Sequence, residues 1–268
     1  MLFRSAGQPI EALLKLLKDP DDRVRHRARI ELSARPTAEL SKPLARWQVD
    51  QFLAVTSANM KAATPTLEVG QKPAIEPGAE APSVADAAHT QLEALWLHQS
   101  HNIIHVGLLE LVLESPDYRA RAAAVRVLAT WRDDLLGLPG NLPSGASVTD
   151  ARDKSQQRAI ELLLRAAADE SSRVRLMAIW AASFIPKAEA YEVLLVAREQ
   201  AMDPPLTHLA NEVARTLQPL YDEAKKAGRD VVFKTAAGRR HILKKLSNED
   251  LLKQPRDRAV LVELLYRS

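Results

Sequence analysis

Three segments of the chain repeat one pattern, and this repetition limits the possible folds more than any other feature. The segments are 19–32, 115–128 and 169–182, and they align without gaps. Each begins with a residue able to cap a helix and continues with two arginines that are separated by one residue. An alanine follows three residues after the second arginine. A degraded fourth copy starts at Asp203 and Pro204. Repeats of this kind are typical of chains built from stacked supersecondary units.

The first residue of each repeat predicts the start of a helix. Asp19, Ser115 and Asp169 have side chains that accept hydrogen bonds from free backbone N–H groups, so we expect them at the N-cap. Pro20 and Pro116 would then take the first helical position, where the missing N–H of proline costs nothing.

An apolar helix is predicted before each repeat. Before the first copy, Ile10, Leu13, Leu14 and Leu17 follow the spacing of one buried helical face, and similar spacings precede the other copies. The unit is therefore a helix, a tight turn and a second helix. Because one hairpin cannot bury its own apolar faces, we expect an all-α fold, an α-solenoid of about four to five hairpins. Only 4% of residues are aromatic and nine are glycine, which argues against a barrel or a sandwich.

Composition divides the chain into four regions. Residues 1–55 hold the first repeat and an irregular helix. Residues 56–88 contain four prolines, two glycines and few large apolar side chains, so we expect a long disordered insert. Residues 89–220 hold the core repeats, interrupted by a shorter excursion over 138–149. Residues 221–268 form a helical C-terminal extension.

The pattern within this extension changes several times. We expect an extended stretch over 230–234, a helix over 235–246, a short helix capped by Ser247, and a last helix over 258–266. That last helix ends the chain without a tail. We therefore expect a fragment of a longer protein, in which this helix has a further stacking partner.

The repeated arginines favour a structural role. Arg25, Arg121 and Arg175 each lie six residues after the first residue of their repeat. In stacked hairpins they would form a ladder with cap-region carboxylates of the adjacent repeat, and arginine binds carboxylate with two parallel bonds. The alternative is a basic groove for phosphate or an acidic peptide. The predicted acceptors of the ladder are Asp19, Asp117 and Asp169. The arginines that favour the groove are Arg23, Arg119, Arg126, Arg132 and Arg173.

Three histidines lie close together in the sequence. His98, His101 and His105 would share one face if this stretch were a single helix, and three imidazoles can chelate a transition metal. No carboxylate lies on that face within one turn. Hydrogen bonding inside or between repeats is therefore the preferred interpretation, and metal binding is the alternative.

The chain lacks the residues that several classes of protein function require. The chain has no cysteine, which excludes disulfides, thiolate zinc sites, iron–sulfur clusters and covalent haem attachment. No nucleotide-binding, zinc-protease or serine-hydrolase motif is present. The start is no signal peptide and no stretch approaches the length of a membrane span, so the chain as written is expected to be soluble. The net charge of +3 does not demand nucleic acid. We predict no catalytic residue, no cofactor and no small-molecule substrate.

The second helix of each unit resembles the HEAT-repeat family. Its pattern is a cap followed by Arg-Val-Arg and then alanine, as over 23–28 and 173–178. A narrower resemblance is to the HEAT region of large planctomycete-type membrane-bound dehydrogenases that are described as haem-binding. It rests on 92–102, 119–128, 173–184 and 246–256, and Leu-Trp-Leu-His-Gln-Ser-His-Asn over 95–102 is its most specific part.

The narrower resemblance implies an exported, periplasmic protein. In that family a propeller-like dehydrogenase module precedes the helical repeats and a c-type haem module follows them. This chain has neither module, and Ser100 stands where the family has tryptophan. No catalytic residue of the family is matched, so only the role of the middle segment is implied.

The predicted function is therefore a non-catalytic HEAT-repeat scaffold that binds protein, as the helical segment of a larger redox protein. The alternative is a helical-repeat protein that binds nucleic acid on an Arg-rich concave face.

Overall fold

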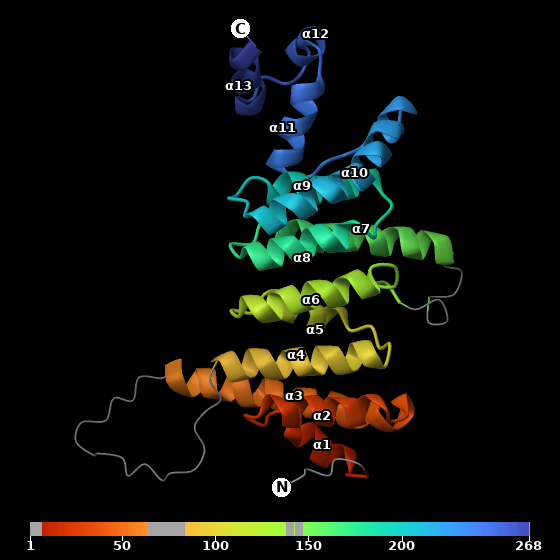
Figure 1. The fold of residues 1–268 in the computed structure, drawn as a ribbon, viewed down its shortest axis with the longest axis vertical. Helices are drawn as coiled ribbons and strands as arrows, with labels where there is room; N and C mark the ends of the chain where they lie inside the picture. Colours follow the sequence, from red (N-terminus) through yellow and green to blue (C-terminus); the bar gives the residue numbers. More distant parts are fainter. Residues whose placement is uncertain (1–6, 64–83, 138–141, 143–146, 268) are drawn as a thin grey trace, which may run out of the picture. The chain divides into compact units, whose positions relative to one another are not determined.

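The computed structural model describes residues 7–63, 84–137, 142 and 147–267, and over these residues the chain is helical (Figure 1). This described part contains thirteen α-helices, one short 3-10 helix and no strand. Successive helices are joined by turns and stack on their neighbours, which confirms the predicted all-α α-solenoid of helical hairpins. The chain divides into two compact units, Met1–Val127 and Leu128–Ser268.

In the first unit, α4 lies at the centre of the packing. It contacts α2, α3 and α5, and α1 contacts both α2 and α3. Leucines fill the interior, among them Leu13 in α1, Leu44 in α3 and Leu95 in α4. The helices of this unit are α1 (Ile10–Leu16), α2 (Asp22–Ser33), α3 (Thr37–Ala63), α4 (Val84–Ser100), α5 (Val106–Leu113) and most of α6 (Tyr118–Trp131).

In the second unit, alternate helices pack on one another. α7 contacts α9 and α8 contacts α10, while α7 also pairs with α8 as the two arms of one hairpin. This is the stacking that the apolar spacing predicts. The helices are α7 (Val148–Ala167), α8 (Ser172–Ala182), η2 (Ala188–Ala190), α9 (Tyr191–Ala197), α10 (Pro204–Lys226), α11 (Ala236–Lys245), α12 (Asn248–Leu252) and α13 (Arg258–Arg267).

The later elements agree with the sequence pattern. Asp203 caps α10 through a bond from the Leu206 N–H, Thr235 caps α11 and Ser247 caps α12. The last three helices share a small core of Leu243, Leu251 and Val260.

The boundaries of the predicted insert differ from the structure. α3 continues to Ala63, so 40–55 belongs to one long helix with Pro43 inside it. α4 begins at Val84. The two edges of the predicted insert 56–88 are therefore helical, and its remaining part, 64–83, lies outside the described residues. Most of the excursion over 138–149 also lies outside them, and α7 takes up its end.

The three repeats begin with the same turn, but the predicted N-caps are wrong by two residues. The caps are Asp21, Asp117 and Ser171, and Asp21 and Asp117 accept the N–H of Arg23 and Arg119. The residues predicted as caps instead accept the N–H two positions on, at 2.8, 3.2 and 2.8 Å. These residues are Asp19, Ser115 and Asp169. They order the turn before the helix starts.

The second arginine of each repeat closes this turn. Arg25 donates through Nη1 to the carbonyl oxygens of Asp19 and Pro20, at 2.6 and 3.0 Å. Arg121 and Arg175 make the equivalent bonds, each to the carbonyls six and five residues before it. The predicted ladder is therefore wrong in its acceptors, because these bonds reach backbone carbonyls of the same turn and not carboxylates of a neighbouring repeat.

Arg175 also joins two successive turns of the second unit. Its Nη2 donates to the Ala201 carbonyl at 2.6 Å, and its Nη1 reaches Gln200 Oε1 at 3.0 Å. Gln200 in turn donates to the Ala168 carbonyl at 2.7 Å. Arg175 is only 3% exposed, so this link between the α7–α8 and α9–α10 turns is buried.

A buried carboxylate holds α11 against α9. Glu192, in the first turn of α9, is 1% exposed. It accepts the N–H of Lys234 and both the N–H and the hydroxyl of Thr235, at 3.0, 2.6 and 2.6 Å. The negative charge thus lies at the N-terminus of α11, where the helix dipole favours it. Gly238 makes the approach possible, since a Cβ there would lie 2.5 Å from Glu192 Oε1 and 2.5 Å from Phe233 Cβ.

The replacement Arg175→Ala is expected to destabilise the protein by about 3 kcal/mol, because it leaves several buried acceptors without a donor. Arg25→Ala should cost about 1 kcal/mol, since the Arg25 side chain is 17% exposed and its backbone acceptors, Asp19 and Pro20, lie within one turn. Urea unfolding followed by circular dichroism measures both, with exposed Arg173→Ala as the control. Equal losses for all three variants would contradict the assigned role of the turn arginines.

The replacement Gly238→Ala is expected to cost about 2 kcal/mol, because the new methyl group overlaps Glu192 and Phe233. Gly107→Ala is the matched control, since its Cβ would meet nothing closer than 3.8 Å. Thermal unfolding of the two variants gives the comparison. A Gly238→Ala variant as stable as the control would show that α11 is not seated on Glu192 in this way.

Candidate functional site

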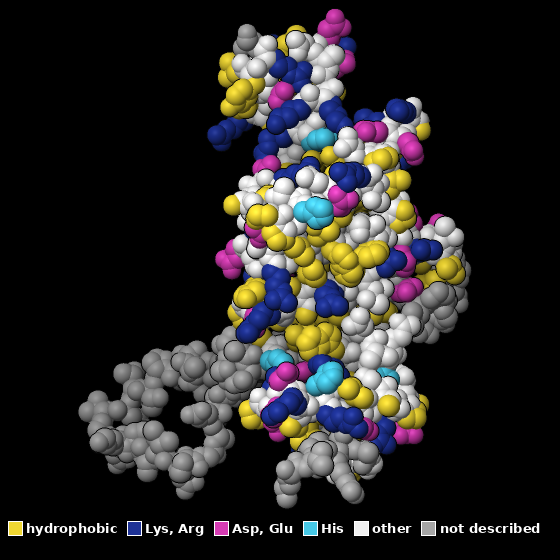
Figure 2. All heavy atoms as spheres, viewed as in Figure 1, with side chains coloured by type: hydrophobic (Ala, Val, Ile, Leu, Met, Phe, Trp, Pro, Cys, Tyr) yellow, Lys and Arg dark blue, Asp and Glu magenta, His cyan; other side chains and the backbone are white. Residues whose placement is uncertain are grey.

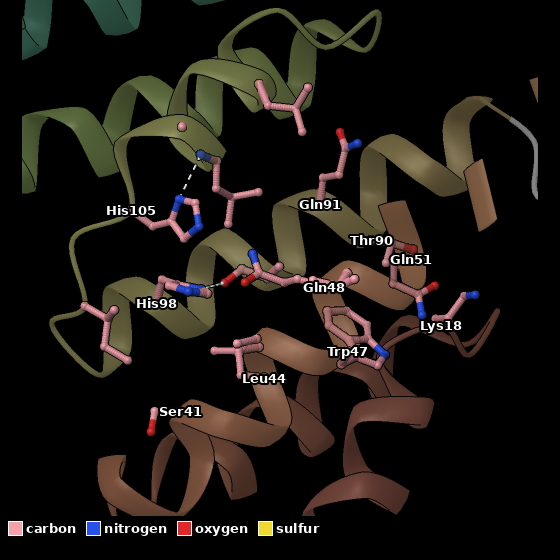
Figure 3. A pocket seen from close by; sticks show the side chains of 17 residues that line it. Lys18, Ser41, Leu44, Trp47, Gln48, Gln51, Thr90, Gln91, His98 and His105 are labelled. Carbon is pink, nitrogen blue, oxygen red and sulfur yellow. Dashed lines mark hydrogen bonds between the residues drawn. The ribbon is translucent and has the colours of Figure 1, made fainter. Parts of the chain in front are cut away.

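The first unit contains an open cavity of about 560 Å³, which we call the α3–α5 groove (Figure 3). α3 and α5 form its walls and α4 forms its floor. On α3 the lining residues recur at the spacing of one helical face, from Ser41 through Gln48 to Gln51. Thr90, Gln91, Ala94 and His98 line it from α4, and Ile103, His105, Gly107, Leu108 and Leu111 line it from α5 and the turn before it.

The groove lies at a place where hairpins of this protein otherwise pack closely. α1 contacts α3 directly and α7 contacts α9 directly, whereas the groove lies between α3 and α5. Small side chains leave room for the cavity, since Ala45, Ala94 and Gly107 are among the residues that line it. Two apolar side chains of the lining remain in solvent: Val49 is 56% exposed and Leu111 is 41% exposed.

Four polar side chains of the lining have no partner among the described residues. The side-chain amides of Gln48, Gln51 and Gln91 form no hydrogen bond with another described residue. Lys18 forms no ion pair within the same part of the chain. No carboxylate is among the described residues that line the groove. The groove therefore combines an apolar surface with free amides and positive charge.

The three candidate histidines do not share one helix face. α4 ends at Ser100, and the chain turns at Asn102, which has a φ of 52°. His98 and His105 line the same end of the groove, with ring centroids 5.2 Å apart and planes at 86° (Figure 3). His101 lies elsewhere and bridges α2 and α3, through contacts of 3.0 Å to Thr37 Oγ1 and 3.1 Å to the Leu32 carbonyl.

Both imidazoles in the groove are held by backbone groups. His98 is 5% exposed and donates through Nδ1 to the Ala94 carbonyl at 2.9 Å. His105 is the N-cap of α5, and its Nδ1 accepts the Leu108 N–H at 3.1 Å. These bonds agree with the predicted hydrogen-bonding role. Within the described residues, no group of three His, Asp or Glu side chains is arranged to hold a metal ion.

Burial controls the protonation of His98. Loss of solvent lowers the pKa of the His98 imidazole, the bond to Ala94 opposes this, and the charges of His105 and His101 lower the pKa further. His98 is therefore neutral at physiological pH and presents an uncharged ring to the groove.

The arginines proposed for a basic groove are largely paired. Arg23 and Arg119 each bind the cap carboxylate two residues before them, and these bonds lower the pKa of Asp21 and Asp117. Arg132 binds the Phe184 carbonyl and lies over the Phe184 ring. On the face shown in Figure 2, Lys and Arg side chains lie among acidic and apolar ones within each unit and form no continuous stripe.

The match to one family model agrees with the fold. Residues 106–215, from α5 into α10, match the HEAT repeats family. No protein with a curated description matches the sequence. No described helix is both long and apolar enough to cross a membrane.

Two solved structures match the chain, both with TM-scores below 0.5. A crystal structure of an engineered protein has 17% identity and a TM-score of 0.39, over 96% of this chain and 93% of that chain. A designed armadillo repeat protein in complex with the peptide (KR)4 has 14% identity and a TM-score of 0.34, over 96% and 99%. Neither similarity bears on what this chain binds.

The sequence patterns identified the histidines but not the groove. The residues that form the groove come from α3, α4 and α5, and the sequence of each of these helices has an ordinary amphipathic pattern. The one available signal is the spacing of Gln48 and Gln51 on the same α3 face as buried Leu44, which places amides where a packed hairpin needs apolar side chains.

Lowering the pH from about 7.5 to about 5.5 is expected to destabilise the protein. The folded pKa of His98 lies below its unfolded value, so the unfolded chain binds the proton more readily and stability falls as the pH drops through this range. His241 in the second unit is shifted in the same direction, chiefly by burial, and adds to the effect.

Thermal unfolding at the two pH values measures this loss, and a His98→Gln variant should show a smaller one. Exposed His208→Gln is the matched control. If His98→Gln keeps the full dependence on pH, His98 is not the group responsible.

Proposed function

We propose that the chain is a non-catalytic protein-interaction module, a HEAT-type scaffold that receives a segment of a partner protein in the α3–α5 groove. The observation that carries this proposal is the groove itself. It exposes Val49 and Leu111 between two helices at a place where the other hairpins of the chain bury such side chains against each other. An exposed apolar surface with a polar rim is typical of an interaction site.

The chemistry of the groove supports binding rather than catalysis. Among the described residues that line the groove, His98 and His105 are the titratable side chains besides Lys18, and both use Nδ1 to bond the backbone. No carboxylate among the described lining residues orients either ring, as an acid–base pair would require.

We further propose the context that the sequence resemblance implies. The chain would be the helical segment of a larger exported redox protein, with dehydrogenase and haem c modules supplied by other parts of that protein. Support comes from the motif over 95–102 and the three other matching segments. The partner segment would then belong to one of those modules or to another subunit.

The nucleic-acid alternative has less support. It needs free arginines on one surface, whereas Arg23 and Arg119 are bound to their own cap carboxylates. In the C-terminal extension, Arg239 pairs with Asp257, Arg240 with Glu199, and Lys245 with Asp222. Such pairs weaken the attraction to phosphate on which nucleic-acid binding depends.

Photo-crosslinking tests the proposed function. A benzophenone side chain is placed at position 49, 111 or 148, all of which are exposed apolar positions, and only the first two line the groove. After irradiation in cells that express the protein, mass spectrometry identifies the adducts. We expect the same partner protein at 49 and 111 and not at 148. Identical adducts at all three positions, or none at the groove, would contradict the proposal.

A further inference from the structure

We propose that the partner segment in the α3–α5 groove is an amphipathic α-helix with an acidic polar face. This inference rests on the proposed function and names the chemistry of the partner at the same site. It follows from the length of the groove, its charge and its free amides.

The length of the groove suits one face of a short helix. The α3 lining runs from Ser41 to Gln51, about 15 Å at the helical rise. Apolar anchors at i, i+3, i+4 and i+7 of a bound helix span about 10 Å and fit within this length. Val49, Ile103 and Leu111 provide accessible apolar surface that such anchors would contact.

The position of the groove also favours a helix. A helix lying between α3 and α5 would contact both walls and the α4 floor, and so would supply the helix-to-helix packing that α1 has with α3 and α7 has with α9. A single extended strand would leave its backbone groups without partners against this apolar lining.

The charge of the groove selects an acidic partner. Lys18 lies at the end near Gln51, away from the two imidazoles, and has no partner among the described residues (Figure 3). No carboxylate is among the described residues that line the groove, so nothing in the described lining offsets the charge of Lys18. Positive charge around an apolar groove steers acidic partners and rejects basic ones.

The free amides add polar contacts at the rim. Gln48, Gln51 and Gln91 can each donate and accept a hydrogen bond. They suit carboxylate or amide side chains that flank the apolar anchors of a bound helix. Those side chains would supply the hydrogen-bond partners that the three glutamines lack among the described residues.

Fluorescence anisotropy with labelled synthetic peptides tests this inference. One peptide of 16 residues carries leucine at i, i+3, i+4 and i+7 with glutamate on its polar face. A second has lysine in place of each glutamate, and a third has the acidic composition in scrambled order. We expect the acidic amphipathic peptide to bind at least about tenfold more tightly than either of the others, and the preference to weaken with salt.

Variants of the full chain place the binding in the groove. Val49→Glu and Leu111→Glu should each weaken binding of the acidic peptide by about tenfold, because they add negative charge to exposed apolar lining positions. Val148→Glu is the matched control, since Val148 is 52% exposed and does not line the groove. Lys18→Glu should reduce or reverse the preference for the acidic peptide. Thermal unfolding confirms that each variant is folded.

Two outcomes would overturn the inference: equal binding of acidic and basic peptides, or acidic-peptide binding unaffected by Leu111→Glu. Its failure differs from failure of the proposed function. If crosslinks at 49 and 111 identify a protein partner but the acidic peptide does not bind, only the inference fails. If no partner is crosslinked at the groove, both fail.

Discussion

Backbone carbonyls in the short turns between helices need hydrogen-bond donors, and in this chain arginine supplies them. Three times, a guanidinium reaches back six residues and binds two successive carbonyls, while an Asp or Ser at the start of the turn binds the N–H two positions on. The turn thereby has a defined geometry, and the second helix of each hairpin starts at a fixed place relative to the first. Burial of the apolar faces depends on that geometry. A buried backbone carbonyl without a hydrogen-bond donor would cancel much of the stabilising free energy that the packing contributes.

Where this packing is completed, the chain has an ordinary solenoid interior. In the second unit, α7 lies on α9 and α8 on α10, and Arg175 with Gln200 links the successive turns. In the C-terminal extension, the start of a helix is again fixed by hydrogen bonds to a buried side chain. There the Glu192 carboxylate binds Thr235, the N-cap of α11, and Gly238 allows the two segments to approach.

Where the packing is incomplete, the first unit has a surface able to bind. The α3–α5 groove keeps apolar side chains in solvent and leaves three side-chain amides and one lysine without described partners. The same forces that stabilise the hairpins, apolar contact and satisfaction of polar groups, would there favour a helix from another chain. The proposed scaffold function thus rests on a gap in the stacking of the helices.

The sequence by itself determined the helices, most of their capping residues in the later part, and the solenoid class. These features are local: the period of 3.6 residues and the chemistry of caps act within a few residues of the chain. The sequence also identified the turn arginines and His98, His101 and His105 as candidate residues, but it did not identify their hydrogen-bond partners. Even the N-caps of the three repeats differ by two residues from the pattern, because Asp19 and its equivalents order the turn rather than the helix.

Only the tertiary structure decided what those side chains meet. Arg25 and its equivalents bind their own turns, His101 bonds to Thr37 and Leu32 instead of facing the other two imidazoles, and α3 and α5 lie on either side of a groove. Each of these facts depends on the angles and distances at which separate segments come together. Periodicity along one helix tells which face is buried, but it carries no information about how closely a second helix approaches that face.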